Sequence, residues 1–139
     1  MDPADGEVYL YSQFEVADSR RVFAVAEQPD LKATFQFTVT APAHWTVFAN
    51  ELEERVQDAD GKGDDDAARV WHFPPTPPLS SYVTAIVAGP YHVGEREFSF
   101  TTGDEREIPM RVACRASLGE FLDTEELQDV AAAGMEFYE

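Results

Sequence analysis

The strongest constraint on the fold is an alternation of apolar and polar side chains with a period of two. It is clearest in residues 34–40, where Phe35, Phe37 and Val39 alternate with threonine and glutamine. Successive side chains of a β-strand point to opposite faces, so this pattern predicts a strand with one buried face. Similar patterns between turn residues predict further short strands: residues 7–15, 45–49, 70–73, 82–88, 97–101 and 108–114. We therefore expect an all-β fold, mainly antiparallel, built as a sandwich or curved sheet.

The periodicity changes near the C-terminus. Asp123 and Glu126 have the spacing of a capping box, which marks the start of a helix. Small and apolar residues then recur on one helical face: Leu127, Val130, Ala131, Gly134 and Tyr138. The sequence therefore predicts one C-terminal helix from about residue 124.

The charge of the chain excludes several classes of partner. Its 139 residues contain 27 acidic and 10 basic side chains, for a net charge of −17. A field of this sign repels nucleic acid and argues against a basic membrane-surface helix. No apolar run approaches the roughly 20 residues of a membrane span. The acidic N-terminus is unlike a signal peptide, and the lone Cys114 fits a reducing compartment, so we expect a cytoplasmic location.

Residues 51–68 form an acidic segment that we interpret as a mobile loop between two strands. Asp58, Asp60 and Gly63 are spaced as in a calcium-binding loop. Lys62 and Arg69, however, occupy two positions that need oxygen ligands. A solvated run of charges is therefore favoured over a calcium site.

Residues for catalysis or metal binding are not arranged as known motifs require. His44, His72 and His92 are isolated, and the sequence has no H-E-x-x-H. Cys114 lies in an apolar strand, which favours an inert buried thiol over a nucleophile. We expect no catalytic residue and no metal ligand in this chain.

Gln13 and Glu15 form the most informative polar pair. They are two residues apart, so they share one face of the predicted strand. A carboxylate beside an amide at a strand end forms a cup for a cationic head group. Alternatively, Glu15 pairs with Arg20 or Arg21, and the residues alone do not decide between the two.

Three blocks of sequence resemble the aminopeptidase N family of zinc metallopeptidases, especially its actinobacterial branch. The first contains Y-S-Q-F-E at residues 11–15, R-R-V-F at 20–23 and Q-P-D-L-K-A-T-F at 28–35. The second is T-P-P-L-S-S-Y-V-T-A-I-V-A-G-P-Y at 76–91, and the third is I-P-M-R-V-A-C-R-A-S-L at 108–118. Glu27 departs from the family pattern, which usually has aspartate at that place.

The resemblance implies a fold and a role. Residues 1–122 would form most of a saddle-shaped N-terminal β domain, and residues 123–139 a helix leading toward the catalytic domain. Glu15 would bind the α-ammonium group of a peptide substrate, and Gln13 would line the first specificity pocket. The partners would be the N-terminus of that peptide and the catalytic domain of the same enzyme.

The resemblance also implies zinc in the complete metallo-aminopeptidase, a hydrolase of peptides. This sequence lacks H-E-x-x-H, the distant glutamate ligand and the G-A-M-E-N substrate strand. It therefore resembles a piece of the enzyme, and we expect it to bind no zinc and to be inactive alone. The alternative is a non-catalytic β-sandwich that acts as a binding or interaction module.

Overall fold

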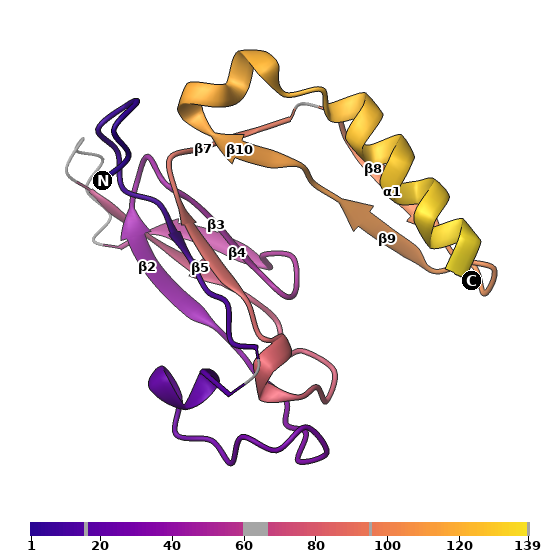
Figure 1. Ribbon diagram of the computed structural model, residues 1–139. Helices are drawn as coiled ribbons and strands as arrows, with labels where there is room; N and C mark the ends of the chain where they lie inside the picture. The colour runs from indigo at the N-terminus through magenta and orange to yellow at the C-terminus, as the bar shows by residue number, and fades with distance from the viewer. Residues whose placement is uncertain (16, 60–66, 95, 139) are drawn as a thin grey trace. The chain divides into compact units, whose positions relative to one another are not determined.

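The computed structural model describes residues 1–15, 17–59, 67–94 and 96–138 (Figure 1). The chain divides into two compact units. The first contains Met1–Asp2 and Glu7–Pro90, and the second contains Pro3–Gly6 and Tyr91–Glu139. Antiparallel strands in small sheets, with one helix near the C-terminus, make up most of the regular structure. The predicted all-β class with a C-terminal helix is confirmed.

Two three-stranded antiparallel sheets form the first unit. One has the order β1-β6-β3 and consists of Leu10–Tyr11, Ile86–Gly89 and Thr46–Ala49. The other has the order β2-β5-β4 and consists of Thr38–Pro42, Ala68–His72 and Arg55–Asp58. Two short 3-10 helices, η1 (Ser19–Arg21) and η2 (Ser81–Val83), lie in the segments between strands.

The core of the first unit draws on both sheets. Val47 and Ala88 come from the first sheet, Ala41 and Trp71 from the second, and Phe73 follows β5. The alternation in residues 34–40 is confirmed, because the apolar side chains are half-buried and the threonines are exposed. Burial of these apolar faces provides most of the driving force for joining the two sheets.

Several predicted strands differ from the observed ones in extent. Only Leu10–Tyr11 of residues 7–15 pair in a ladder, because the Ile86 N–H then bonds to the side-chain hydroxyl of Ser12 instead of to its carbonyl. Residues 82–88 begin in η2 and pair only from Ile86. Residues 108–114 split between two strands, since each half has a different partner.

The segment expected as an acidic loop contains a strand. Arg55–Asp58 form β4, which pairs with β5 in register from Arg55 opposite His72 to Asp58 opposite Arg69. All four residues of β4 are exposed, so no apolar periodicity reveals the strand in the sequence. Residues 60–66 lie outside the described residues, and with them the calcium-loop positions Asp60, Lys62 and Gly63.

The second unit combines two strand pairs with the helix. Strand β7 (Tyr91–Val93) pairs with β10 (Ala113–Arg115), and β8 (Phe98–Thr101) pairs with β9 (Glu107–Met110). A 3-10 helix, η3 (Ala116–Phe121), leads to α1 (Thr124–Tyr138), which contacts β8 (Figure 1). The predicted helix is confirmed, whereas the expected domain boundary at residue 123 stays a prediction.

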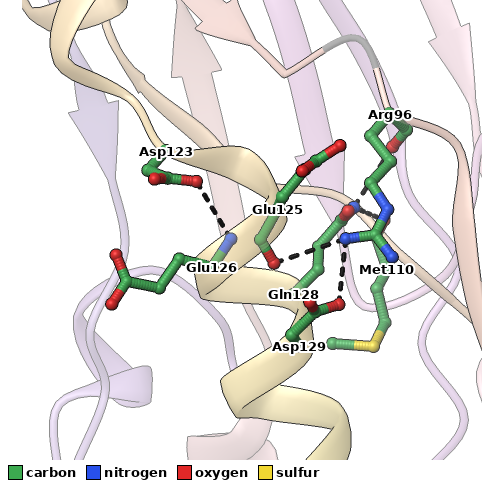
Figure 2. Close-up of polar contacts among 7 residues, drawn as sticks. All are labelled: Arg96, Met110, Asp123, Glu125, Glu126, Gln128 and Asp129. Carbon is green, nitrogen blue, oxygen red and sulfur yellow. Dashed lines mark hydrogen bonds and ion pairs between the residues drawn. The ribbon is translucent and has the colours of Figure 1, made fainter.

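Polar contacts hold the start of α1 (Figure 2). A carboxylate oxygen of Asp123 accepts the N–H of Glu126 at 3.0 Å, which is the predicted cap. Gln128 is fully buried, and its Nε2 donates to the carbonyls of Arg96 and Met110, each at 3.1 Å. The predicted apolar face instead lies largely exposed, with Val130 exposed by 66%.

Candidate functional site

The segment with Gln13 and Glu15 leaves the edge of the first sheet directly after β1. Ser12 fixes its start, because its N–H donates to the Ile86 carbonyl at 2.9 Å and its hydroxyl accepts the Ile86 N–H at 2.8 Å. Phe14 is buried, and its ring packs edge-on against Phe23 with 5.5 Å between centroids. Gln13 and Glu15, on either side of Phe14 in the sequence, are both exposed.

The structure brings Gln13 and Glu15 together through the backbone of Glu15. With the Gln13 amide oriented to satisfy both groups, its nitrogen donates to the Glu15 carbonyl at 3.2 Å. Its oxygen then accepts the Glu15 N–H at 3.3 Å. These contacts join the side chain of Gln13, the predicted pocket residue, to the backbone of Glu15, the predicted ammonium anchor.

Both nearby arginines pair with other carboxylates. The guanidinium of Arg21 lies 3.7 Å from Asp18, and Nε of Arg20 lies 3.5 Å from Glu27. Among the residues that the structure describes, the Glu15 carboxylate forms no hydrogen bond or ion pair. The alternative pairing of Glu15 with Arg20 or Arg21 is therefore not the observed arrangement.

A surface pocket of about 400 Å³ lies beside Gln13. Its lining is mostly apolar, with Gln13 and the Asp18–Arg21 ion pair as polar groups: Leu10, Tyr11, Ser12, Gln13, Phe14, Asp18, Arg21, Val22 and Ile86. The volume lies within the range of small-molecule sites, and apolar walls with a few polar groups are typical of them. The pocket can accept an apolar side chain, and Glu15 is absent from its lining but is joined to the lining residue Gln13 through its backbone.

Glu27 is not in the pocket lining but bonds to η1, whose Arg21 lines the pocket, and the sequence alone assigned Glu27 no role in the site. One of its oxygens accepts the Ser19 hydroxyl at 2.6 Å and the Arg20 N–H at 3.1 Å. Burial raises the pKa of the Glu27 carboxyl, but these hydrogen bonds and the charge of Arg20 outweigh it, so the pKa is lowered. The eight-residue separation of Ser19 and Glu27 matches no regular element, so periodicity offers no signal for the contact.

The histidines lie in unrelated places. His44 precedes β3 with its ring edge-on to Trp45, His72 ends β5, and His92 lies in β7. The described residues include no group of three or more His, Cys, Asp or Glu that could hold a metal ion. This part of the chain therefore does not fit a zinc site. Cys114, in β10, is half-buried.

In the acidic segment, Asp58 and Arg69 face each other across β4 and β5, with 3.6 Å between charged atoms. The first position of the calcium-like loop is thus paired with its twelfth. Within the described parts of the chain, no helix has the length and apolar character that crossing a membrane requires.

Comparison with known proteins places these features in context. Residues 1–83 match the family model of the peptidase M1 N-terminal domain. Over all 139 residues the chain is 46% identical to an Aminopeptidase N of Streptomyces lividans, of which it covers 15%. Over 80 residues, 58% of the chain, it is 38% identical to an Aminopeptidase N of Acetobacter pasteurianus and covers 21% of it. Over 91 residues, 66% of the chain, it is 29% identical to the Aminopeptidase N of Rattus norvegicus and covers 9% of it. The chain thus spans between 9% and 21% of the length of these relatives.

Proposed function

Because this chain belongs to the M1 peptidase family through its N-terminal domain, we propose that it is the substrate-anchoring part of an aminopeptidase. The complete enzyme would remove N-terminal residues from peptides. Glu15 would bind the α-ammonium group of the substrate, and Gln13 would line the pocket for the first side chain. The names of the relatives favour this function over a non-catalytic binding module.

The Glu15 carboxylate, which has no hydrogen bond or ion pair among the residues that the structure describes, is the observation that carries the proposal. Arg20 and Arg21 are engaged by Glu27 and Asp18, so neither neutralises Glu15. Gln13 joins the backbone of Glu15 to an apolar pocket. The first residue of a peptide presents an ammonium group and a side chain on one carbon atom, and this site offers a complement to each.

The charge of Glu15 gives the selectivity that an exopeptidase needs. An ammonium group marks the end of a peptide, whereas an internal peptide bond carries no charge. A carboxylate desolvated by bound substrate gains an ion pair with the correct end, and it is left unpaired by an internal segment. Glu15 would thereby align the first peptide bond with the hydrolytic centre.

Zinc in the complete enzyme would supply an activated water and polarise the scissile carbonyl. The described residues contain no ligand group for it, so the proposal assigns no metal to this chain. The role of Glu15 and Gln13 is to bind and orient the substrate. The proposed location is the cytoplasm, in keeping with a single cysteine that has no partner cysteine in the sequence.

The test uses a full-length enzyme in which this chain replaces the matching segment of the Streptomyces lividans relative. Glu15 is then substituted in that exchange enzyme. Glu15→Ala should cost about 2–4 kcal/mol of transition-state binding, or roughly 30- to 1,000-fold in kcat/KM. Glu15→Gln should lose most of the same amount, because it keeps the shape and removes the charge. Values within about threefold of the parent for both variants would contradict the proposal.

Two controls isolate the ammonium contact. Glu54→Gln removes another exposed carboxylate of the same unit, and it should leave kcat/KM unchanged. An N-acetylated substrate lacks the ammonium group, so the parent should already process it poorly. Glu15→Gln should then lower its turnover little further, because variant and substrate remove the same ion pair.

A further inference from the structure

We propose that Glu27 is a positioning residue that, with Ser19, fixes one wall of the Gln13 pocket and thereby sets the preference for the first residue of the substrate. The inference rests on the proposed function, because it assigns that pocket to the first side chain. Glu27 itself is absent from the pocket lining. It acts through η1.

The Glu27 carboxylate is buried and has several partners. Its side chain is only 9% exposed, although it is charged. One oxygen accepts the hydroxyl of Ser19 and the N–H of Arg20, and the other lies 3.5 Å from Nε of Arg20. Hydrogen bonds to a charged acceptor are stronger than neutral ones. Glu27 therefore closes the loop from residue 19 to residue 27.

The residues that Glu27 holds continue directly into the pocket wall. Ser19, which is fully buried, and Arg20 begin η1, and Arg21 and Val22 then line the pocket. Asp18, on the other side of Ser19, also lines the pocket and donates its N–H to the Phe14 carbonyl at 3.0 Å. A shift of η1 therefore moves this whole wall.

Ser19 also links this wall to the segment that leads into β6. Its hydroxyl lies 3.0 Å from that of Ser81, which begins η2. Strand β6 follows η2, and its first residue, Ile86, also lines the pocket and donates its N–H to the Ser12 hydroxyl. The position of this wall relative to Ile86 thus depends on a polar cluster that Glu27, Ser19 and Ser81 form.

One oxygen of Glu27 accepts both hydrogen bonds; the other is buried, forms no hydrogen bond within the described residues and lies 3.5 Å from Nε of Arg20. An amide at this place keeps one acceptor, but its NH₂ group then confronts the hydrogen-bond donors of Arg20. Aspartate keeps the charge and loses one methylene group. Glu27→Gln should therefore loosen η1, whereas Glu27→Asp should largely preserve it.

The experiment measures specificity, which a purely structural role leaves unchanged. In the full-length exchange enzyme, kcat/KM is measured for a leucine anilide and for an alanine anilide. Both values are calculated from the concentration of active enzyme. Glu27→Gln should lower the leucine-to-alanine ratio by about three- to tenfold, because a displaced wall packs less well on a large side chain. Ser19→Ala should lower it in the same way, and Glu27→Asp should stay within about twofold of the parent.

Asp104→Asn is the matched control. The Asp104 carboxylate likewise accepts a hydroxyl, from Thr102, and pairs with Nε of Arg106 at 2.9 Å, but it lies in the other unit. The ratio should not change in this variant. An unchanged ratio in Glu27→Gln, or an equal change in Asp104→Asn, would overturn the inference.

The remaining outcomes are also decisive. If Glu27→Gln does not fold, an unchanged ratio in Ser19→Ala overturns the inference and a lowered ratio supports it. A normal ratio in Glu27→Gln together with lost activity in Glu15→Gln would overturn the positioning role alone. A lowered ratio together with unchanged activity in Glu15→Gln would overturn the ammonium anchor and leave the role of Glu27 standing.

Discussion

At the scale of single residues, buried polar side chains organise the irregular parts of this protein. The amide of Gln128, in α1, donates to two backbone carbonyls. The Ser19 hydroxyl donates to the Glu27 carboxylate and so ties η1 to residue 27. An apolar replacement at any of these places would leave a backbone or side-chain group without its partner. The cost of such an orphaned group exceeds the net gain from an ordinary hydrogen bond.

Glu27 should contribute to stability in a pH-dependent way. Its pKa in the folded chain lies below the ordinary value of 4.5, so the unfolded chain takes up the proton first. The contribution is therefore complete above that value and is lost as the pH falls through the folded pKa. In urea titrations, the stability difference between the parent and Glu27→Gln should be largest near neutral pH and should shrink in acid. A difference that stays constant down to acidic pH would contradict this.

Gly94 is required by a close approach to α1. A Cβ at this position would lie 2.2 Å from Oγ1 and 2.9 Å from Cβ of Thr124. Gly94→Ala should therefore lower the free energy of unfolding by about 1–3 kcal/mol. Adding Thr124→Ala should restore part of the loss, because it removes Oγ1 and Cγ2.

Gly134 provides the control for that experiment. Apart from its chain neighbours and the nearby helix backbone, no described atom lies within 4 Å of a Cβ at this position. Gly134→Ala should be neutral or should stabilise the chain by up to about 1 kcal/mol. Chemical denaturation of the three variants and the parent measures both effects, and equal results at the two glycines would argue against the steric account.

At the scale of elements, local side-chain hydrogen bonds decide where regular structure begins and ends. Ser12 takes the hydrogen-bonding groups of Ile86 where β1 would otherwise continue. Asp123 likewise satisfies an N–H group that the first turn of α1 leaves without a helical partner. Depending on its position, such a side chain replaces a backbone hydrogen-bond partner or satisfies a backbone group that has none.

Removing the cap should weaken α1. Asp123→Ala deletes the acceptor of the Glu126 N–H and should cost about 1 kcal/mol in the free energy of unfolding. Asp123→Asn keeps an acceptor oxygen and should restore most of the loss. Urea unfolding followed by far-UV circular dichroism measures both, and an unchanged midpoint for Asp123→Ala would rule out a stabilising cap.

At the scale of the whole molecule, a net charge of −17 is combined with a small apolar core in the first unit. The charge repels polyanions and opposes close association between copies, while the core residues of the first unit join two sheets. Recognition of a cationic peptide end is compatible with such a field, since an ammonium group is drawn toward it.

The chain by itself should bind no stoichiometric zinc and should hydrolyse no aminoacyl anilide. The described residues include no group of three or more metal-ligating side chains, and the sequence has no H-E-x-x-H. Metal analysis after desalting and a chromogenic alanine anilide assay check both expectations. One zinc per chain with chelator-sensitive turnover would contradict them.

The sequence by itself determined the strand alternation of residues 34–40, the cap of α1 and the family resemblance, because each depends on residues close together along the chain. It predicted Gln13 and Glu15 on one face of a strand, whereas both lie beyond β1 and meet through the backbone of Glu15. The alternation of residues 34–40 and the helical face follow from the two- and 3.6-residue periods of strands and helices.

Only the tertiary structure decided which carboxylates form ion pairs with Arg20 and Arg21. It also decided that the hydroxyl of Ser19 contacts that of Ser81, 62 residues away. It also decided that exposed β4 forms on the edge of β5 and that polar Gln128 is buried. Such contacts depend on where separate elements meet, and no local periodicity encodes that meeting. A hydrogen bond between distant residues forms only after the packing of apolar faces has overcome the entropy of bringing them together.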